Sequence, residues 1–124
     1  MASHDLEGLL KRFILGFIDD LKNIFCSERE LNDMMLIECV FNHLSSEDVM
    51  KSTIKNILPY KEYIVARNKD FFVKNYSIFS GLPKDRVAHY TNTITTTLDE
   101  ENIETIFVYF DKIIRICEKY QKNS

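Results

Sequence analysis

The chain has 124 residues, of which 45% are hydrophobic and 28% charged; these values are typical of one globular domain that needs no metal or disulfide to fold. Three Gly, two Pro and no Trp leave few residues for the turns of an all-β fold, so helices are favoured. The net charge of -3 at pH 7 conceals one basic block, residues 51–74, with six basic and two acidic side chains.

The cysteines and the hydropathy pattern exclude several classes of protein. Cys26, Cys39 and Cys117 are odd in number and widely spaced, which argues against a secreted disulfide framework. No basic N-terminal region leads into an apolar run and a cleavage site, and no stretch approaches the about 18 apolar residues that a membrane span needs. We therefore expect a soluble protein that is neither secreted nor membrane-bound.

The first predicted helix covers about residues 5–25. Its apolar side chains fill about half of a helical wheel, an arc too wide for a single neighbour. Leu15 falls outside that arc, on the polar half of the wheel that also holds Lys11 and Lys22. Leu15 is either an isolated exposed leucine, which is common on protein surfaces, or part of a self-association patch. It is our candidate interaction residue.

The second and third predicted helices begin at serine caps. Ser27 and Glu30 have the spacing of a capping box, and Ser45 with Ser46 stops and restarts the chain. Pro59 ends the third helix, because the residue before a proline is displaced from helical angles. The apolar positions of the second helix, which we expect to face the core, are Leu31, Met34, Met35, Ile37, Val40, Phe41 and Leu44.

The region after Pro59 is predicted to contain shorter helices. One begins at Pro59 and runs to about Arg67, and the next contains Phe71 and Phe72. A break at Ser80 and Gly81 precedes a new start at Pro83. The sixth helix is expected to end in the run of residues 93–97, because β-branched side chains lose rotamer freedom in a helix and threonine hydroxyls compete for the backbone.

The last helix, residues 98–120, is the strongest prediction. Its first turns are acidic and its last turns basic, which suits the helix dipole, and Thr97 with Glu100 has capping-box spacing. The core stripe consists of Ile103, Ile106, Phe107, Phe110, Ile113, Ile114 and Cys117. We therefore predict an all-α fold: one domain, residues 1–124, forming a compact bundle of about six to seven helices with a long C-terminal core helix.

Three passages carry a family resemblance: FIDDLKNIF with ERELNDMM, then FFVKNYSIFSGLPKDRVAHY, then LDEENIETIFVYFDKIIRICEKY. Together they resemble a family of small, uncharacterised helical proteins of nucleocytoplasmic large DNA viruses. The shared pattern is an aromatic "IF" segment, a Leu-Pro turn and an acidic start to a core helix that ends near "EKY", with Phe107 where a Trp is common. The resemblance implies a viral protein of the virion or of the infected host cell cytoplasm or nucleus, and it carries over no catalytic residue.

Candidate chemistry is sparse in this sequence. Cys39 and His43 lie four apart on one helix and would share a metal only if further ligands joined them; we interpret them as a packed cysteine beside a surface histidine. His89 and Tyr90 accompany no nucleophile elbow, phosphate loop or metal-binding helix motif. We predict no enzyme, no catalytic residue, no metal, no cofactor and no small-molecule substrate.

The basic block supports an alternative function. Its cations are interleaved with aromatic residues, the mixture that phosphate contacts and base stacking use. The candidate nucleic-acid contacts are Lys51, Lys55, Lys61, Arg67, Lys69 and Lys74. The block has acidic flanks, and its aromatic residues lie at positions where core residues are needed. Nucleic-acid binding is therefore the second hypothesis. The first is a non-enzymatic protein that acts by protein–protein interaction, with homo-oligomerisation as the first contact to expect.

Overall fold

The computed structural model describes residues 2–75 and 77–123, and every regular element in these ranges is helical, as the sequence predicts. Seven α-helices are joined by three short 3-10 or π segments within the described residues. The helices are α1 (Ser3–Ile24), α2 (Glu28–His43), α3 (Ser46–Asn56), α4 (Lys61–Val65), α5 (Asp70–Lys74), α6 (Lys84–Asn92) and α7 (Glu100–Lys122). The short segments are η1 (Leu58–Tyr60), η2 (Ser77–Gly81) and η3 (Thr93–Thr97).

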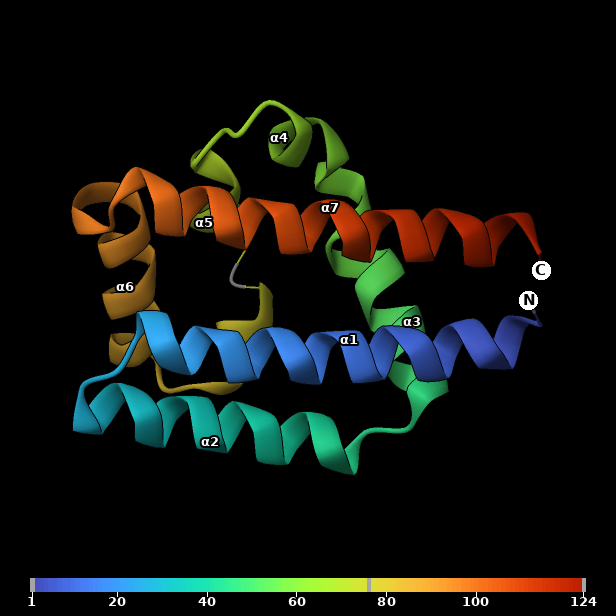
Figure 1. The fold of residues 1–124 in the computed structure, drawn as a ribbon, viewed down its shortest axis with the longest axis horizontal. Coiled ribbons are helices and arrows are strands. Elements are labelled where there is room, and N and C mark those ends of the chain that lie inside the picture. Colours follow the sequence, from blue (N-terminus) through green and yellow to red (C-terminus); the bar gives the residue numbers. More distant parts are fainter. Residues whose placement is uncertain (1, 76, 124) are drawn as a thin grey trace.

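The two longest helices, α1 and α7, lie side by side and run in opposite directions (Figure 1). The ends of the chain therefore meet, and the Ser3 hydroxyl lies 3.4 Å from the Asn123 carbonyl. Helix α2 returns along α1, while α3 crosses both long helices (Figure 1). Helix α1 contacts α2, α3 and α7, and α7 also contacts α3 and α4. The predicted need of α1 for several neighbours is thereby confirmed.

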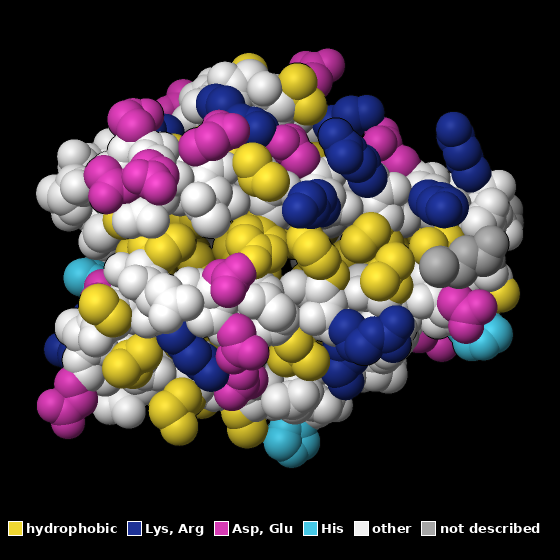
Figure 2. All heavy atoms as spheres, in the orientation of Figure 1, with side chains coloured by type: hydrophobic (Ala, Val, Ile, Leu, Met, Phe, Trp, Pro, Cys, Tyr) yellow, Lys and Arg dark blue, Asp and Glu magenta, His cyan; other side chains and the backbone are white. Residues whose placement is uncertain are grey.

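Aromatic packing joins α1 to α7. The ring of Phe17 stacks on Tyr109, with 4.5 Å between the ring centroids, and meets Phe110 edge-on at 5.5 Å. Hydrophobic side chains follow the seam between these helices on the face seen in Figure 2. Every residue of the predicted α7 stripe is buried, and the buried hydrophobic residues that the structure describes form one cluster. The long C-terminal core helix is thus confirmed.

Helix boundaries follow the predicted caps with one correction. Ser27 and Glu30 form the expected capping box, but the cap of α7 is Asp99, which accepts a hydrogen bond from the Asn102 amide at 2.8 Å. The expected cap, Thr97, is instead the last residue of the π turn η3. Threonine hydroxyls in this turn donate to carbonyls four residues earlier, as Thr96 does to Asn92 at 2.5 Å. They therefore compete with the backbone amides for the carbonyl groups of the helix.

Helix α2 departs from the prediction on one face. Met34 and Ile37 are buried as expected, whereas Met35, Val40 and Leu44 are 59%, 41% and 36% exposed. The sequence pattern made all five look like core residues. The structure differs because α2 packs mainly on α1 and on η2, and this packing leaves Met35, Val40 and Leu44 exposed.

Leu15 is also placed differently from the prediction. It is half-buried and packs against the core instead of standing exposed. Lys11, one turn earlier, donates to the Leu44 carbonyl at 2.6 Å, and Lys22 pairs with Glu38 at 3.0 Å. Residues 11, 15 and 22 share a helix face, so Leu15 lies on the side of α1 that faces α2. The polar half of the helical wheel of α1 is therefore, at these residues, a surface that packs against α2.

The α1–α7 contact gives a test of the core. Replacing Phe17 by Ala removes a fully buried ring and its contacts with Tyr109 and Phe110, so we expect the free energy of unfolding to fall by about 3–5 kcal/mol. Urea denaturation measures the change. Val65→Ala, at a side chain that is 63% exposed, is the control and should change stability by less than about 0.5 kcal/mol. Equal losses in the two variants would contradict this packing.

Candidate functional site

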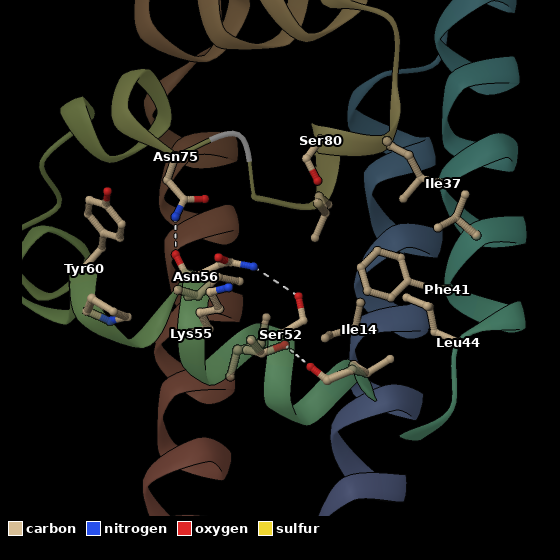
Figure 3. A pocket seen from close by; sticks show the side chains of 18 of the residues that line it. Ile14, Ile37, Phe41, Leu44, Ser52, Lys55, Asn56, Tyr60, Asn75 and Ser80 are labelled. Carbon is tan, nitrogen blue, oxygen red and sulfur yellow. Dashed lines mark hydrogen bonds between the residues drawn. The ribbon is translucent and has the colours of Figure 1, made fainter. Parts of the chain in front are cut away.

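A groove of about 650 Å³ opens between α2 and α3. Ile14 of α1 contributes to its lining (Figure 3). Ile113 of α7 also lines it, and α5 and η2 border it through Lys74 and Ile78. The volume lies within the range of about 300–1,000 Å³ that is usual for ligand pockets. We treat this groove as the candidate site.

One wall of the groove is apolar and belongs to α2. Leu36 and Val40 of α2 and Leu44, its C-cap, recur every four residues, so they form one line along the helix. They are 47%, 41% and 36% exposed, although Ile37 beside them is buried. Phe41 from the same helix points into the groove (Figure 3). Helix α2 therefore presents apolar side chains both to the core and to the mouth of the groove.

The opposite wall is polar and comes from α3 and α5. Asn56 donates its amide to the Ser52 hydroxyl at 3.1 Å, and Asn75 donates to the Asn56 carbonyl (Figure 3). Lys55 and Lys74 lie on the same wall. Both lysine side chains are exposed, and neither makes an ion pair within residues 2–75 and 77–123. The two walls thus differ in chemistry.

The floor is apolar and its one polar group is satisfied. Thr53 is buried there, and its hydroxyl donates to the Val49 carbonyl at 2.7 Å. Ile57 is also buried. No Asp, Glu, His or Cys lines the groove among the described residues, so its ionisable groups are two lysines and Tyr60. This lining suits the binding of an apolar group better than proton transfer.

The structure distributes the six predicted nucleic-acid contacts over separate places. Lys55 and Lys74 reach the groove. The other four lie beside carboxylates: Lys51 with Glu47 at 2.7 Å, Lys61 with Glu118 at 2.6 Å, Lys69 with Glu100 at 3.6 Å, and Arg67 with Glu104 and Asp111. The block that is contiguous in the sequence is therefore not one uniform basic surface.

Arg67 holds the segment between α4 and α5 against α7. Its guanidinium donates two hydrogen bonds to Asp111, at 2.7 and 3.0 Å, and two to Glu104, at 2.8 and 3.1 Å. The hydrogen bonds to Asp111 and then to Glu104 raise its pKa further. Arg67 also has a positive φ of 56°, the left-handed region that costs a non-glycine residue about 1–2 kcal/mol. The four bonds offset that backbone strain.

A polar cluster joins α2 to α6. Arg86 donates from Nε and lies within 2.7 Å of Asp33 through Nη2, and the buried Tyr90 hydroxyl donates to Asp33 at 2.6 Å. Burial and the hydrogen bond to Asp33 raise the pKa of Tyr90, so the phenol stays protonated and remains a donor. His89 lies beside Glu30 at 2.9 Å. Each of these polar groups already has a partner, and the cluster stabilises the contact between α2 and α6.

The cysteine and histidine candidates stay apart from the groove. His43 Nδ1 lies 2.8 Å from the Cys39 carbonyl and 3.8 Å from the Cys39 sulfur. Within the described ranges, no group of three His, Cys, Asp or Glu side chains is arranged to hold a metal. Burial raises the pKa of Cys117 to about 12, which keeps this thiol protonated at neutral pH.

Over residues 2–75 and 77–123, no helix has the length and hydrophobicity of a bilayer span.

Comparison with known proteins places no relative beside this chain: no family model, curated protein or solved structure matches it. The viral resemblance of the three sequence passages therefore stays a prediction. The groove itself was not predicted, because Val40, Phe41 and Leu44, which line it, were assigned to the core face of the second helix.

The strain at Arg67 can be measured by comparing two variants. Arg67→Ala and Arg67→Gly both remove the guanidinium bonds, so both should be less stable than the parent protein. Glycine accepts the positive φ, and we expect its variant to be more stable than the alanine variant by about 1 kcal/mol. Chemical denaturation measures the difference, and an alanine variant as stable as the glycine variant would contradict the strain.

The Glu30–His89 contact predicts a pH dependence. Burial alone would raise the pKa of Glu30, but hydrogen bonds from His89 and Ser27 outweigh it and lower the pKa below the ordinary 4.5. The contribution of this carboxylate to stability is then present above pH 4.5 and is lost as the pH falls through the lowered value. Glu30→Gln should be less stable than the parent at pH 7 by about 1 kcal/mol.

The same difference should shrink as the pH falls below 4.5, because the parent carboxylate then becomes protonated. Thermal unfolding between neutral pH and pH 3 follows the change. The control is Glu62→Gln, at an exposed carboxylate that makes no ion pair within the described parts of the chain. If the difference in stability between Glu30→Gln and the parent is constant over this pH range, the charge of Glu30 adds nothing to stability.

Proposed function

We propose that this protein acts without catalysis, by binding another protein through the groove between α2 and α3. The observation that carries the proposal is the line of large apolar side chains, Leu36, Val40 and Leu44, left exposed at the mouth of a 650 Å³ hollow. Covering apolar surface is worth about 25 cal/mol per Å², and contiguous exposed apolar surface beside a hollow is typical of interaction sites.

The chemistry of the lining supports binding over catalysis. A general acid or base is most often His, Glu or Asp, and the described residues that line the groove include none of these. The polar clusters elsewhere, around Asp33 and Arg67, hold their charges in mutual hydrogen bonds. A protein surface with apolar anchors needs no further group to act as a recognition module.

The nucleic-acid alternative has less support than the basic block suggested. Phosphate binding needs Lys and Arg side chains whose charge is available to neutralise a phosphate. Four of the six candidates already lie beside carboxylates. Lys55 and Lys74 remain, on the polar wall of the groove. A role in the virion or in an infected cell rests on the sequence resemblance alone.

Peptide selection tests the proposed function without knowledge of the natural partner. A phage-displayed library of helical and extended peptides is selected on the immobilised protein and then compared on Val40→Glu and Val65→Glu. Both valines are exposed on helices, at 41% and 63%, but only Val40 lines the groove. We expect enriched peptides to bind the parent and Val65→Glu alike and to bind Val40→Glu at least about 10-fold more weakly.

Selected peptides that bind both variants equally would overturn the groove as the binding surface, as would a selection that yields no binder. Light scattering of the parent protein runs beside this test. Self-association that Val40→Glu abolishes and Val65→Glu leaves intact would mean that the protein recognised by the groove is a second copy, in agreement with the expected homo-oligomer.

A further inference from the structure

The two walls of the groove demand different chemistry from whatever fills it. The α2 wall offers Leu36, Val40 and Leu44, while the α3 and α5 wall offers the ammonium groups of Lys55 and Lys74. A uniformly apolar segment would bury the polar wall without hydrogen bonds, which costs free energy. A uniformly polar one would leave the α2 wall uncovered. The complementary segment is therefore amphipathic.

The charge of the groove is opposite in sign to that of the whole protein. Asp and Glu make up 19 of the 124 residues, and the net charge is -3, yet none of the 20 lining residues is acidic and two are lysines. Lys74 lies over the ring of Tyr63, 5.7 Å from its centroid, and has no carboxylate partner among the described residues. The field at this wall favours an anionic group.

The backbone of the ligand segment is best satisfied as a helix. An extended segment would need partners for its amide and carbonyl groups, and no strand edge exists among the described residues to supply them. The amides of the polar wall are already engaged, Asn56 with Ser52 and Asn75 with Asn56. A helix pairs its own backbone groups internally, and residues 36 to 44 of α2 offer it a line of contacts about 12 Å long.

From these observations, and resting on the proposed function, we infer that the groove receives an amphipathic helix of a different protein. Its apolar stripe packs on Leu36, Val40 and Leu44 of α2, and its carboxylates lie against Lys55 and Lys74. A stripe spaced i, i+4 and i+7 matches the α2 line over about two to three turns.

A second copy of the chain fits the groove less well. The exposed large hydrophobic residues described are Met35, Leu36, Val40, Leu44, Val65 and Val73. Three of them belong to α2 and Leu44 is its C-cap, whereas Val65 of α4 and Val73 of α5 do not line the groove. The chain therefore offers a second copy no exposed apolar stripe outside this region, among the described residues, that could enter the groove.

A small anionic amphiphile also fits the groove less well. A fatty acid would occupy the 650 Å³ hollow, but it would leave the 47%-exposed Leu36 and its neighbours at the mouth uncovered. A helix fills the groove and covers its rim in one contact.

Three synthetic peptides of about 18 residues, ~27 Å as helices, test the inference. The acidic peptide is alanine-based, with leucines at i, i+4 and i+7 and two glutamates flanking that stripe. The basic peptide has lysines in place of the glutamates, and the scrambled peptide keeps the acidic composition without the stripe. Fluorescence anisotropy at low salt measures the affinity of each peptide for the full-length protein, because added salt screens the charges.

We expect the acidic peptide to bind the parent at least about 10-fold more tightly than the basic or scrambled peptide. The double variant Lys55→Glu with Lys74→Glu should reverse the order and prefer the basic peptide. The matched control is Lys84→Glu with Lys112→Glu, which changes the net charge equally at exposed lysines outside the groove and should keep the acidic preference. Circular dichroism of each variant confirms that the helices remain.

Equal binding of the acidic and basic peptides, with both weakened by Val40→Glu, would overturn the acidic part of the inference and leave the proposed function standing. Failure of all three peptides while library-selected peptides bind would overturn the helical form alone. Laurate is the competitor: binding of laurate at the groove with no peptide binding would identify a small amphiphile as the occupant and contradict the helix.

Discussion

The burial of α1 among three other helices governs the architecture. Its apolar arc contains Leu10, Ile14 and Phe17, which are at most 1% exposed, and α2, α3 and α7 each cover part of it. An arc that wide cannot be satisfied by one neighbour. Helix α7 supplies the aromatic contact through Tyr109 and Phe110, and the lysines of α1 tie α2 in place through a carbonyl and a carboxylate. The termini meet because the two long helices run antiparallel.

The groove follows from how that burial is completed. Helices α2 and α3 both rest on α1 but are separated, and Ile14 contributes to the lining of the space between them. Short elements border the space, so its far wall carries the polar and basic side chains of helix ends, such as Asn56 and Lys74. An apolar wall from a long helix thus faces a polar wall from short ones, and the asymmetry that suits an amphipathic ligand results from the fold.

Local signals in the sequence predicted the helices and most of their ends. The stripe of α7 and the capping box at Ser27 depend on residues within one or two turns, so periodicity and spacing reveal them. The cap at Asp99 was missed because Thr97 and Glu100 offer a competing local pattern two residues away. The π turn preceding it depends on which carbonyls the threonine hydroxyls reach, which spacing does not determine.

Tertiary placement could not be predicted in the same way. Periodicity shows that a helix face is apolar but not what covers it, so Leu15 looked exposed and Val40 looked buried, while the structure has the reverse order of exposure. Likewise, six cations close together in sequence differ in their partners: Arg67 meets Asp111, 44 residues away, while Lys55 stays unpaired among the described residues at the groove. The candidate site depends on those long-range differences.

Methyl NMR of the protein with the acidic leucine peptide addresses the groove most directly. Selectively labelled isoleucine, leucine and valine methyl groups report the contact surface residue by residue. Binding at the groove predicts that the shifts, and the nuclear Overhauser effects to the peptide leucines, concentrate on Leu36, Val40 and Leu44 and extend to Ile14 on the floor. Effects on Val65 or along the α1–α7 seam, with the groove methyl groups unchanged, would contradict the account.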